Sequence, residues 1–164
     1  MFITRKGETV EVPGRQPEVN EKAPEFQLYD ANDQVVSLST LAGQPVIISV
    51  IPDINTRVCA LQTKRFNEEA SRLDHVHFLT ISINTKEEQA TWCGQEGVEM
   101  TMLHDPEKTF NEGYHLLMPS LGLYARAIFV LDQDGIIRHR EIVSEMSNEP
   151  DYEQALSVAK ALRD

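Results

Sequence analysis

The segment from Pro45 to Cys59 has the sequence PVIISVIPDINTRVC, and it decides the fold that we predict. Its residues Val46–Ile51 are apolar apart from Ser49 and mostly β-branched, which is typical of a strand buried on both faces. Pro52 ends the apolar run, and polar residues follow it. The segment therefore predicts a central strand, a loop that contains a proline, and then a helix.

The helix that follows is expected from about Thr56 to Leu73. Apolar residues such as Phe66 recur on one face of it, and Thr56 is a suitable N-cap. Cys59 would then lie in the first helical turn, beyond the carboxyl end of a buried strand, where open α/β folds bind ligands. Free backbone N–H groups and the helix dipole stabilise an anion at this position, so we expect Cys59 to exist partly as thiolate.

The rest of the chain alternates strand and helix patterns. We expect strand pairs at Phe2–Thr4 with Thr9–Val12, Phe26–Tyr29 with Val35–Leu38 and Ala125–Leu131 with Ile136–Val143, strands at Val76–Ile83 and Met100–Leu103, and helices from Thr85 to Gly94–Gly97, at Pro106–Tyr114 and from Asn148 or Pro150 to Leu162. This order gives an α/β fold with a mixed central sheet, flanking helices and an added N-terminal β-hairpin. The core order, β-α-β followed by β-β-α, is thioredoxin-like.

The composition excludes several function classes. Of the 164 residues, 41% are hydrophobic and 25% are charged; no repeat or linker divides the chain, so we expect one domain over residues 1–164. No apolar run is long enough to cross a bilayer. A formal net charge of −11 argues against nucleic acid and membranes as partners, because both demand a basic patch. The N-terminal residues lack the apolar stretch of a signal peptide, so we expect a cytoplasmic protein.

The two cysteines, Cys59 and Cys93, carry more chemical information. A reducing compartment disfavours a structural disulfide, so a pair of thiols there is more often catalytic, metal-binding or incidental. The five histidines show no metal-binding spacing, so we expect neither a metal nor a cofactor.

Several motifs resemble the peroxiredoxins. Pro52, Thr56 and Cys59 match the P-x-x-x-T/S-x-x-C signature of that family, and APEFQL at 23–28 resembles the segment that precedes it. Further segments are similar to the thiol peroxidase subfamily, the atypical 2-Cys type: KRFN at 64–67, WCGQEG at 92–97, ARAIFVLD at 125–132 and EPDYE at 149–153. They follow the order of the family over nearly the whole chain.

The resemblance implies a bacterial peroxidase that reduces hydrogen peroxide and organic hydroperoxides. Cys59 would attack the peroxide and become a sulfenic acid, and Cys93 would condense with it to an intramolecular disulfide that thioredoxin reduces. Thr56 would hydrogen-bond the thiolate and the peroxide, Pro52 would shield the pocket, and Arg126 would supply a fixed positive charge. The family also implies a homodimer.

Three positions depart from the usual pattern of the family. Asn55 stands where aspartate is usual, Arg57 where a small residue or proline is common, and Asn20 where glycine is common. Asparagine tolerates a positive φ, so we expect little effect from Asn20. The other two bear on peroxide preference and rate more than on the type of reaction.

Other functions stay open on the residues alone. A thioredoxin-like dithiol exchange protein or redox sensor would use the same thiols, although no C-x-x-C is present, and a silent thioredoxin-fold binding module would bury them unused. A cysteine hydrolase would need a histidine base that no motif positions. A disulfide requires Cα atoms within about 7 Å, so we expect the helix that carries Cys93 to move or unwind during the reaction cycle.

Overall fold

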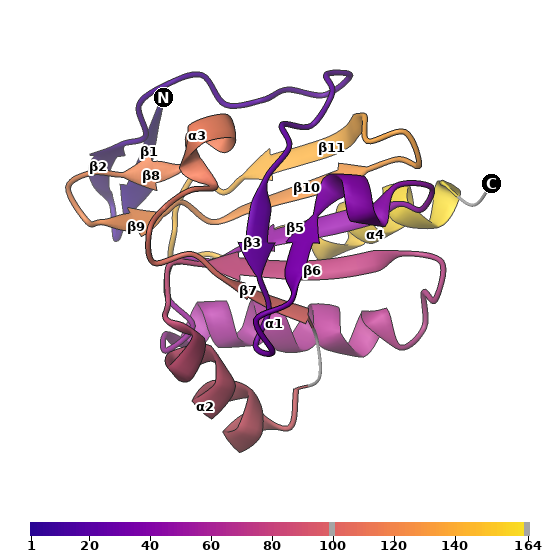
Figure 1. Ribbon diagram of the computed structural model, residues 1–164. Coiled ribbons are helices and arrows are strands. Elements are labelled where there is room, and N and C mark those ends of the chain that lie inside the picture. The colour runs from indigo at the N-terminus through magenta and orange to yellow at the C-terminus, as the bar shows by residue number, and fades with distance from the viewer. Residues whose placement is uncertain (99–100, 163–164) are drawn as a thin grey trace.

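The computed structural model describes residues 1–98 and 101–162, and its centre is a sheet of seven strands in the order β11-β10-β5-β6-β7-β3-β4. These strands are β3 (Gln27–Tyr29), β4 (Val35–Ser37), β5 (Val46–Val50), β6 (His77–Ser82), β7 (Thr101–His104), β10 (Ala127–Leu131) and β11 (Ile137–Ile142). β5, β6 and β7 run parallel to one another, and the other neighbours are antiparallel (Figure 1). The predicted mixed sheet is confirmed.

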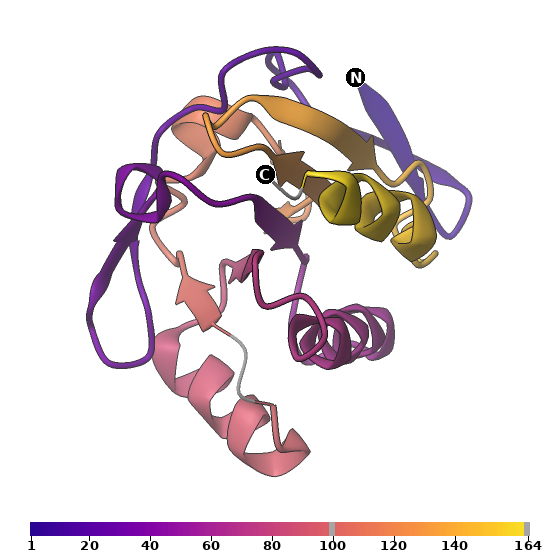
Figure 2. The ribbon, with the colours of Figure 1, turned by 90° about the vertical axis from the view of Figure 1, so that its right-hand side faces the viewer.

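Helices cover the sheet on both faces, which explains the apolar run in β5. The helices are α1 (Arg57–Ala70), α2 (Lys86–Glu96), α3 (Asn111–Tyr114) and α4 (Tyr152–Ala161), with a short 3-10 helix, η1 (Leu38–Leu41). α1 and α4 lie side by side on one face (Figure 2), where Ile47 packs among their apolar residues. Val46, Ile48 and Val50 point to the other face and pack with the aromatic residues around α3.

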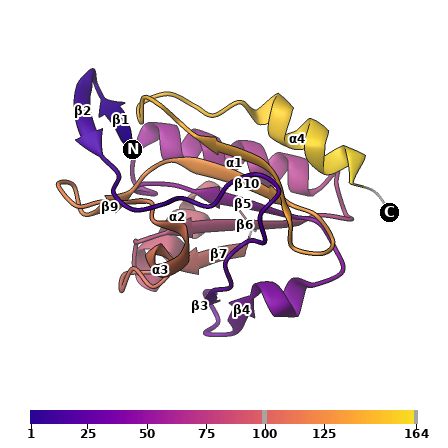
Figure 3. The ribbon, with the colours of Figure 1, turned by 90° about the horizontal axis from the view of Figure 1, so that it is seen from above.

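The N-terminal hairpin lies at one end of the molecule, beside β9 (Figure 3). It consists of β1 (Phe2–Arg5) and β2 (Glu8–Glu11), joined by Lys6 and Gly7 at φ 50° and 83°. Two consecutive positive φ values match the twist of a two-residue hairpin turn. The inward face of the hairpin packs against Met118, Ala125 and Met146, so the predicted hairpin is confirmed.

The structure corrects the helix predicted at Pro106–Tyr114. Only Asn111–Tyr114 is helical, because Lys108 adopts φ 61° and interrupts any helix through that position. The carboxylate of Asp105 instead accepts hydrogen bonds from the backbone N–H groups of Thr109 and Phe110, at 2.8 and 3.0 Å. Asp105 therefore caps a compact turn.

Other boundaries shift by a few residues. α4 begins at Tyr152 because Asp151, rather than Asn148 or Pro150, caps it by accepting from the N–H of Gln154. The sequence did not predict η1 or the small hairpin of β8 (Leu117–Met118) and β9 (Leu123–Tyr124). Met100, the predicted first residue of the β7 strand, lies outside the described residues.

Two further features of the backbone involve polar residues. Asn20 adopts φ 76°, a conformation that asparagine tolerates better than most residues. The capping box from Thr85 to Glu88 is present at the start of α2. In the described part of the chain, no helix is both long and apolar enough to cross a membrane.

Candidate active site

Cys59 lies in the first turn of α1, directly after the loop that leaves β5. Thr56 is the N-cap of this helix, as predicted, and the side chain of Cys59 is 0% exposed. It packs in the core between β5 and the helices, together with Ile54 and Phe66. Water therefore does not reach the sulfur of Cys59 in this conformation.

Arg126 approaches Cys59 from the neighbouring strand. It precedes β10, whose first residue Ala127 pairs with Val50 at the end of β5, and its side chain is only 2% exposed. Its Nη1 donates to the sulfur of Cys59 at 3.4 Å. The fold thus places a permanent positive charge against the thiol, in the pair of positions that the sequence predicted.

The guanidinium of Arg126 is held on every side. Its Nε and Nη2 donate to the backbone carbonyl of Met146 at 3.1 and 2.9 Å, and its Nη1 also donates to Oε1 of Gln62 at 3.0 Å. Gln62 in turn donates from Nε2 to the hydroxyl of Ser49 in β5, at 2.7 Å. All these side chains are buried, so the position of the charge is fixed by the core.

Sequence reasoning missed Gln62 and Met146. Gln62 follows Cys59 by less than one helical turn, so it faces the same region, but a lone glutamine in a helix gives no functional signal. Met146 contributes a backbone carbonyl, which every residue carries. Neither could be assigned before the chain was folded.

Thr56 and Pro52 flank the cysteine in the loop between β5 and α1. The hydroxyl of Thr56 donates to the carbonyl of Asp53 at 2.8 Å, and the residue is exposed. Its hydroxyl oxygen keeps lone pairs with which it can accept a hydrogen bond. Pro52 is buried beside the end of β5, and Arg57 is exposed to solvent.

Cys93 lies near the C-terminal end of α2 and packs against the same core cluster that contains Cys59. Both cysteines are free thiols, and burial raises the pKa of Cys93. A cavity of about 270 Å³ lies beside Cys93, lined also by Val98 and Met102. The structure therefore shows two free thiols at one core cluster, and Arg126 donates to the sulfur of Cys59.

Comparisons with known proteins show the family of this chain. The AhpC/TSA family model matches residues 19–140. The chain belongs to the AhpC/TSA family.

Relatives within the family extend the match over the whole chain. The thiol peroxidase of Bacillus subtilis (strain 168) is 41% identical over 162 residues, which is 98% of this chain and 97% of that protein. A peroxiredoxin-like protein from Aquifex aeolicus superposes with a TM-score of 0.91 at 25% identity, covering 99% and 97% of the two chains. The resemblance to thiol peroxidases that the motifs indicated is thereby confirmed.

A second solved structure bears on the fold alone. The thiol peroxidase from Chromobacterium violaceum superposes with a TM-score of 0.87 at 16% identity, covering 98% of this chain and 96% of that one. The predicted thioredoxin-like fold with an added N-terminal hairpin is confirmed.

In this member of the AhpC/TSA family, α2 is tied down at both ends. At its start, Thr85 and Glu88 form the capping box, and at its end Gly97 closes the helix at φ 68°. An ion pair of 2.6 Å between Lys64 and Glu96 joins the C-terminal turn of α2 to α1. Cys93 lies about one turn before this ion pair, in the segment of α2 between the two attachments.

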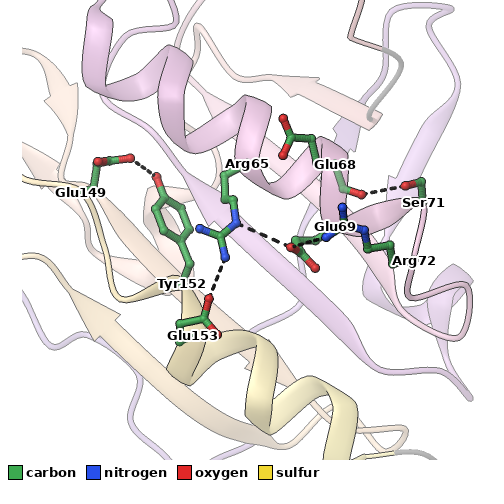
Figure 4. A network of polar contacts seen from close by, with 8 residues as sticks. All are labelled: Arg65, Glu68, Glu69, Ser71, Arg72, Glu149, Tyr152 and Glu153. Carbon is green, nitrogen blue, oxygen red and sulfur yellow. Dashed lines mark hydrogen bonds and ion pairs between the residues drawn. The ribbon is translucent and has the colours of Figure 1, made fainter.

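The EPDYE segment at 149–153, one of the motifs that resemble thiol peroxidases, joins α4 to α1 (Figure 4). The hydroxyl of Tyr152 donates to Glu149 at 2.8 Å, and its ring packs edge-on against Phe66 and lies 5.0 Å below the guanidinium of Arg65. Arg65 also forms a 2.7 Å ion pair with Glu153. Because Met146 lies on the connection that leads into α4, this packing supports the carbonyl that holds Arg126. Phe66 and Trp92 are both buried in the core.

Proposed function

We propose that this protein reduces hydrogen peroxide and organic hydroperoxides, with the thiolate of Cys59 as the attacking group. The observation that carries the proposal is the 3.4 Å contact between Nη1 of Arg126 and the sulfur of Cys59, inside a core that excludes water. Thiol-dependent peroxidase activity is supported further by relatives named thiol peroxidase, at about 40% identity over nearly the whole chain.

The chemical step needs more than a thiolate. An ordinary thiol is a few per cent ionised at pH 7, so full ionisation increases the rate only roughly 30-fold. The sulfur of Cys59 attacks one oxygen of the O–O bond, the bond breaks, and the other oxygen leaves as hydroxide or alkoxide and takes up a proton. Arg126 and the N–H groups of the first turn of α1 stabilise the negative charge on the leaving oxygen. Thr56 accepts a hydrogen bond from the peroxide, and Pro52 limits the entry of water.

The second step joins the two thiols. The sulfenic acid of Cys59 condenses with the thiol of Cys93, a disulfide forms, and water leaves. The raised pKa of Cys93 suits this role, because a neutral thiol does not compete for the peroxide. The helix α2 must shift or unwind near Cys93 before the sulfur atoms meet. A thioredoxin-type dithiol then reduces the disulfide by thiol–disulfide exchange.

The remaining parts of the proposal concern the setting of the protein. We place it in the cytoplasm, where thioredoxin systems keep thiols reduced. Residues 1–164 act as one domain, since the hairpin β1–β2 and α4 both pack on the sheet. The protein works as a homodimer, as the family resemblance implies.

The choice of oxidant separates this proposal from the alternatives. Reduced protein is mixed in parallel with hydrogen peroxide, cumene hydroperoxide and a small linear disulfide, and the intact mass is followed with time. A peroxidase loses two hydrogen atoms rapidly with either peroxide, and slowly with the disulfide. Faster oxidation by the disulfide would indicate a dithiol exchange protein, and slow reaction with every oxidant a silent binding module. Either of these results overturns the proposal.

A further inference from the structure

Asn84 links the two segments that carry the cysteines. It lies between β6 and α2, immediately before the N-cap residue Thr85, and is 6% exposed. Its side chain does not contact either cysteine. It points instead into the loop between β5 and α1, which leads to Cys59.

Both ends of the Asn84 amide are engaged in that loop. Its Oδ1 accepts from the backbone N–H of Ile54 at 2.9 Å, and its Nδ2 donates to Oδ1 of Asp53 at 3.0 Å. An aspartate at position 84 could accept from Ile54 but could not donate to Asp53. The site therefore selects an amide, which supplies an acceptor and a donor on one short side chain.

The contact with Asp53 extends to Thr56. The same Oδ1 of Asp53 accepts from the N–H of Asn55 at 3.0 Å, and the carbonyl of Asp53 accepts from the N–H and the hydroxyl of Thr56, at 3.1 and 2.8 Å. Asn84 thereby fixes the turn that sets the start of α1, three residues before Cys59. A small shift of this turn would move the sulfur relative to the charge of Arg126.

The loop is also tied to the first turn of α2. The side-chain amide of Asn55 donates to Oε2 of Glu88 at 3.4 Å, while Oε1 of Glu88 accepts from the N–H of Thr85 at 3.0 Å. The loop before Cys59 and the beginning of α2 thus form one hydrogen-bonded unit. Cys93 lies two turns further along α2, beyond this unit.

We propose that Asn84 is a positioning residue for both steps of the reaction, an inference that rests on the proposed function. It sets the loop that orients Cys59 toward the peroxide. It also anchors the first turn of α2, so that the helix hinges beyond Glu88 and delivers Cys93 to a sulfenic acid that has not moved. Peroxide attack and disulfide formation therefore depend on the same amide.

The test exchanges the two polar groups. The variant Asn84→Asp places two carboxylates side by side and removes the donor, whereas Asp53→Asn together with Asn84→Asp restores one donor and one acceptor with the groups reversed. The exposed residue Gln154 in α4 provides a matched control, Gln154→Glu, which adds the same charge elsewhere. Stopped-flow mixing with hydrogen peroxide gives the rate constant for Cys59 oxidation and, from the single tryptophan, Trp92, the rate of the disulfide step.

We expect Asn84→Asp to slow both steps at least about tenfold, the double variant to recover to within about threefold of wild type, and the control to match wild type. If Asn84→Asp does not fold, Asn84→Ala tests the inference instead, because it removes both hydrogen bonds of the amide without adding a charge and must slow both steps at least about tenfold. Wild-type rates in Asn84→Asp or Asn84→Ala, or a double variant slower than Asn84→Asp, would overturn it. A wild-type protein that reacts slowly with peroxide would instead overturn the proposed function.

Discussion

The charge of Arg126 lies against the sulfur of Cys59, and both residues are buried. Among residues 1–98 and 101–162, none of the ion pairs involves Arg126. A buried cation without a counter-charge costs several kcal/mol. In the proposed reaction, the thiolate of Cys59 supplies that counter-charge.

Substitution of Arg126 tests the role of this charge. Arg126→Lys keeps the positive charge but removes the guanidinium, which donates to Met146, Gln62 and Cys59 at the same time. We expect the rate constant for peroxide reduction to fall about 10²-fold, and further in Arg126→Gln. The rate constants of both variants are measured by competition for peroxide with a peroxidase of known rate constant. Equal rates in Arg126→Gln and wild type would show that the charge plays no part in the reaction.

Gln62 should matter through Arg126. The variant Gln62→Leu removes the acceptor for Nη1 of Arg126 and the donor to Ser49. With one restraint lost, the guanidinium can turn away from the sulfur, and we expect about a tenfold loss of peroxide rate. Ser49→Ala keeps the contact between Gln62 and Arg126, so it should lose less. The prediction is wrong if Ser49→Ala is the more damaging change.

The two cysteines should separate the two steps. Cys59→Ser should abolish the reaction with peroxide, because burial raises the pKa of Cys93 and a neutral thiol is a poor nucleophile. Cys93→Ser should consume one equivalent of peroxide and stop at the sulfenic acid of Cys59. A dimedone adduct detected by mass spectrometry identifies that product. Oxidation of Cys93 in the Cys59→Ser protein, at the wild-type rate, would reverse the assignment of the two thiols.

The ion pair between Lys64 and Glu96 should slow the disulfide step. It joins α1 to the last turn of α2 at 2.6 Å and is partly exposed, so it contributes about 0.2–1 kcal/mol. Glu96→Gln should release Cys93 more readily and accelerate disulfide formation up to about fivefold, without changing the peroxide step. Salt should accelerate the step in wild type and have little effect in the variant.

The exposed residue Glu107 provides a control for this prediction, because Glu107→Gln removes a carboxylate from the turn after β7 and leaves the residues of α2 unchanged. The control should behave like wild type. A slower disulfide step in Glu96→Gln would mean that the ion pair presents Cys93 to Cys59 and does not restrain it.

Glu145 should make the attachment of the N-terminal hairpin dependent on pH. Its carboxylate accepts from the hydroxyl and N–H of Ser147, from the N–H of Gly7 and Lys6 and from the hydroxyl of Thr4, and these bonds hold its pKa well below the usual 4.5. A lowered pKa in the folded state stabilises the fold fully above the ordinary pKa, and this stabilisation is lost as the pH falls below it.

Melting temperatures of wild type and Glu145→Gln should therefore differ most above about pH 5. The difference should shrink as the pH falls toward 3, because the carboxylate of wild type is increasingly protonated in the unfolded state. Glu11→Gln, at an exposed position of β2, is a matched control and should follow wild type. A difference that is constant from pH 7 to pH 3 would contradict this account.

Much of the fold could be predicted from the sequence, because local patterns and burial agree. β5 can be recognised in the sequence as an apolar run, because both faces of the sheet are covered. The start of α1 can be recognised from its N-cap, Thr56. The helix predicted at Pro106–Tyr114 was wrong because the left-handed conformation of Lys108 is imposed by the turn around Asp105. Nothing in the composition of that segment signals it.

The site could be predicted only in part, because some of its residues act through partners that are distant in the sequence. Cys59 is a potential nucleophile and Arg126 carries a permanent charge, and both lie in family motifs. The structure brings them into contact. Gln62 and Asn84 are neutral amides whose partners, Arg126 and Asp53, come from distant segments of the chain. Such partners can be assigned only when the sheet has set the segments side by side.

The most direct test of the account is the rate constant for the reaction of the reduced protein with hydrogen peroxide, measured by stopped flow at near-stoichiometric concentrations. We predict a value at least about 10³-fold above that of free cysteine, with both thiols lost in one protein molecule. A value near that of free cysteine, with both thiols intact, would contradict the central claim that the buried pair of Cys59 and Arg126 is built to reduce peroxides.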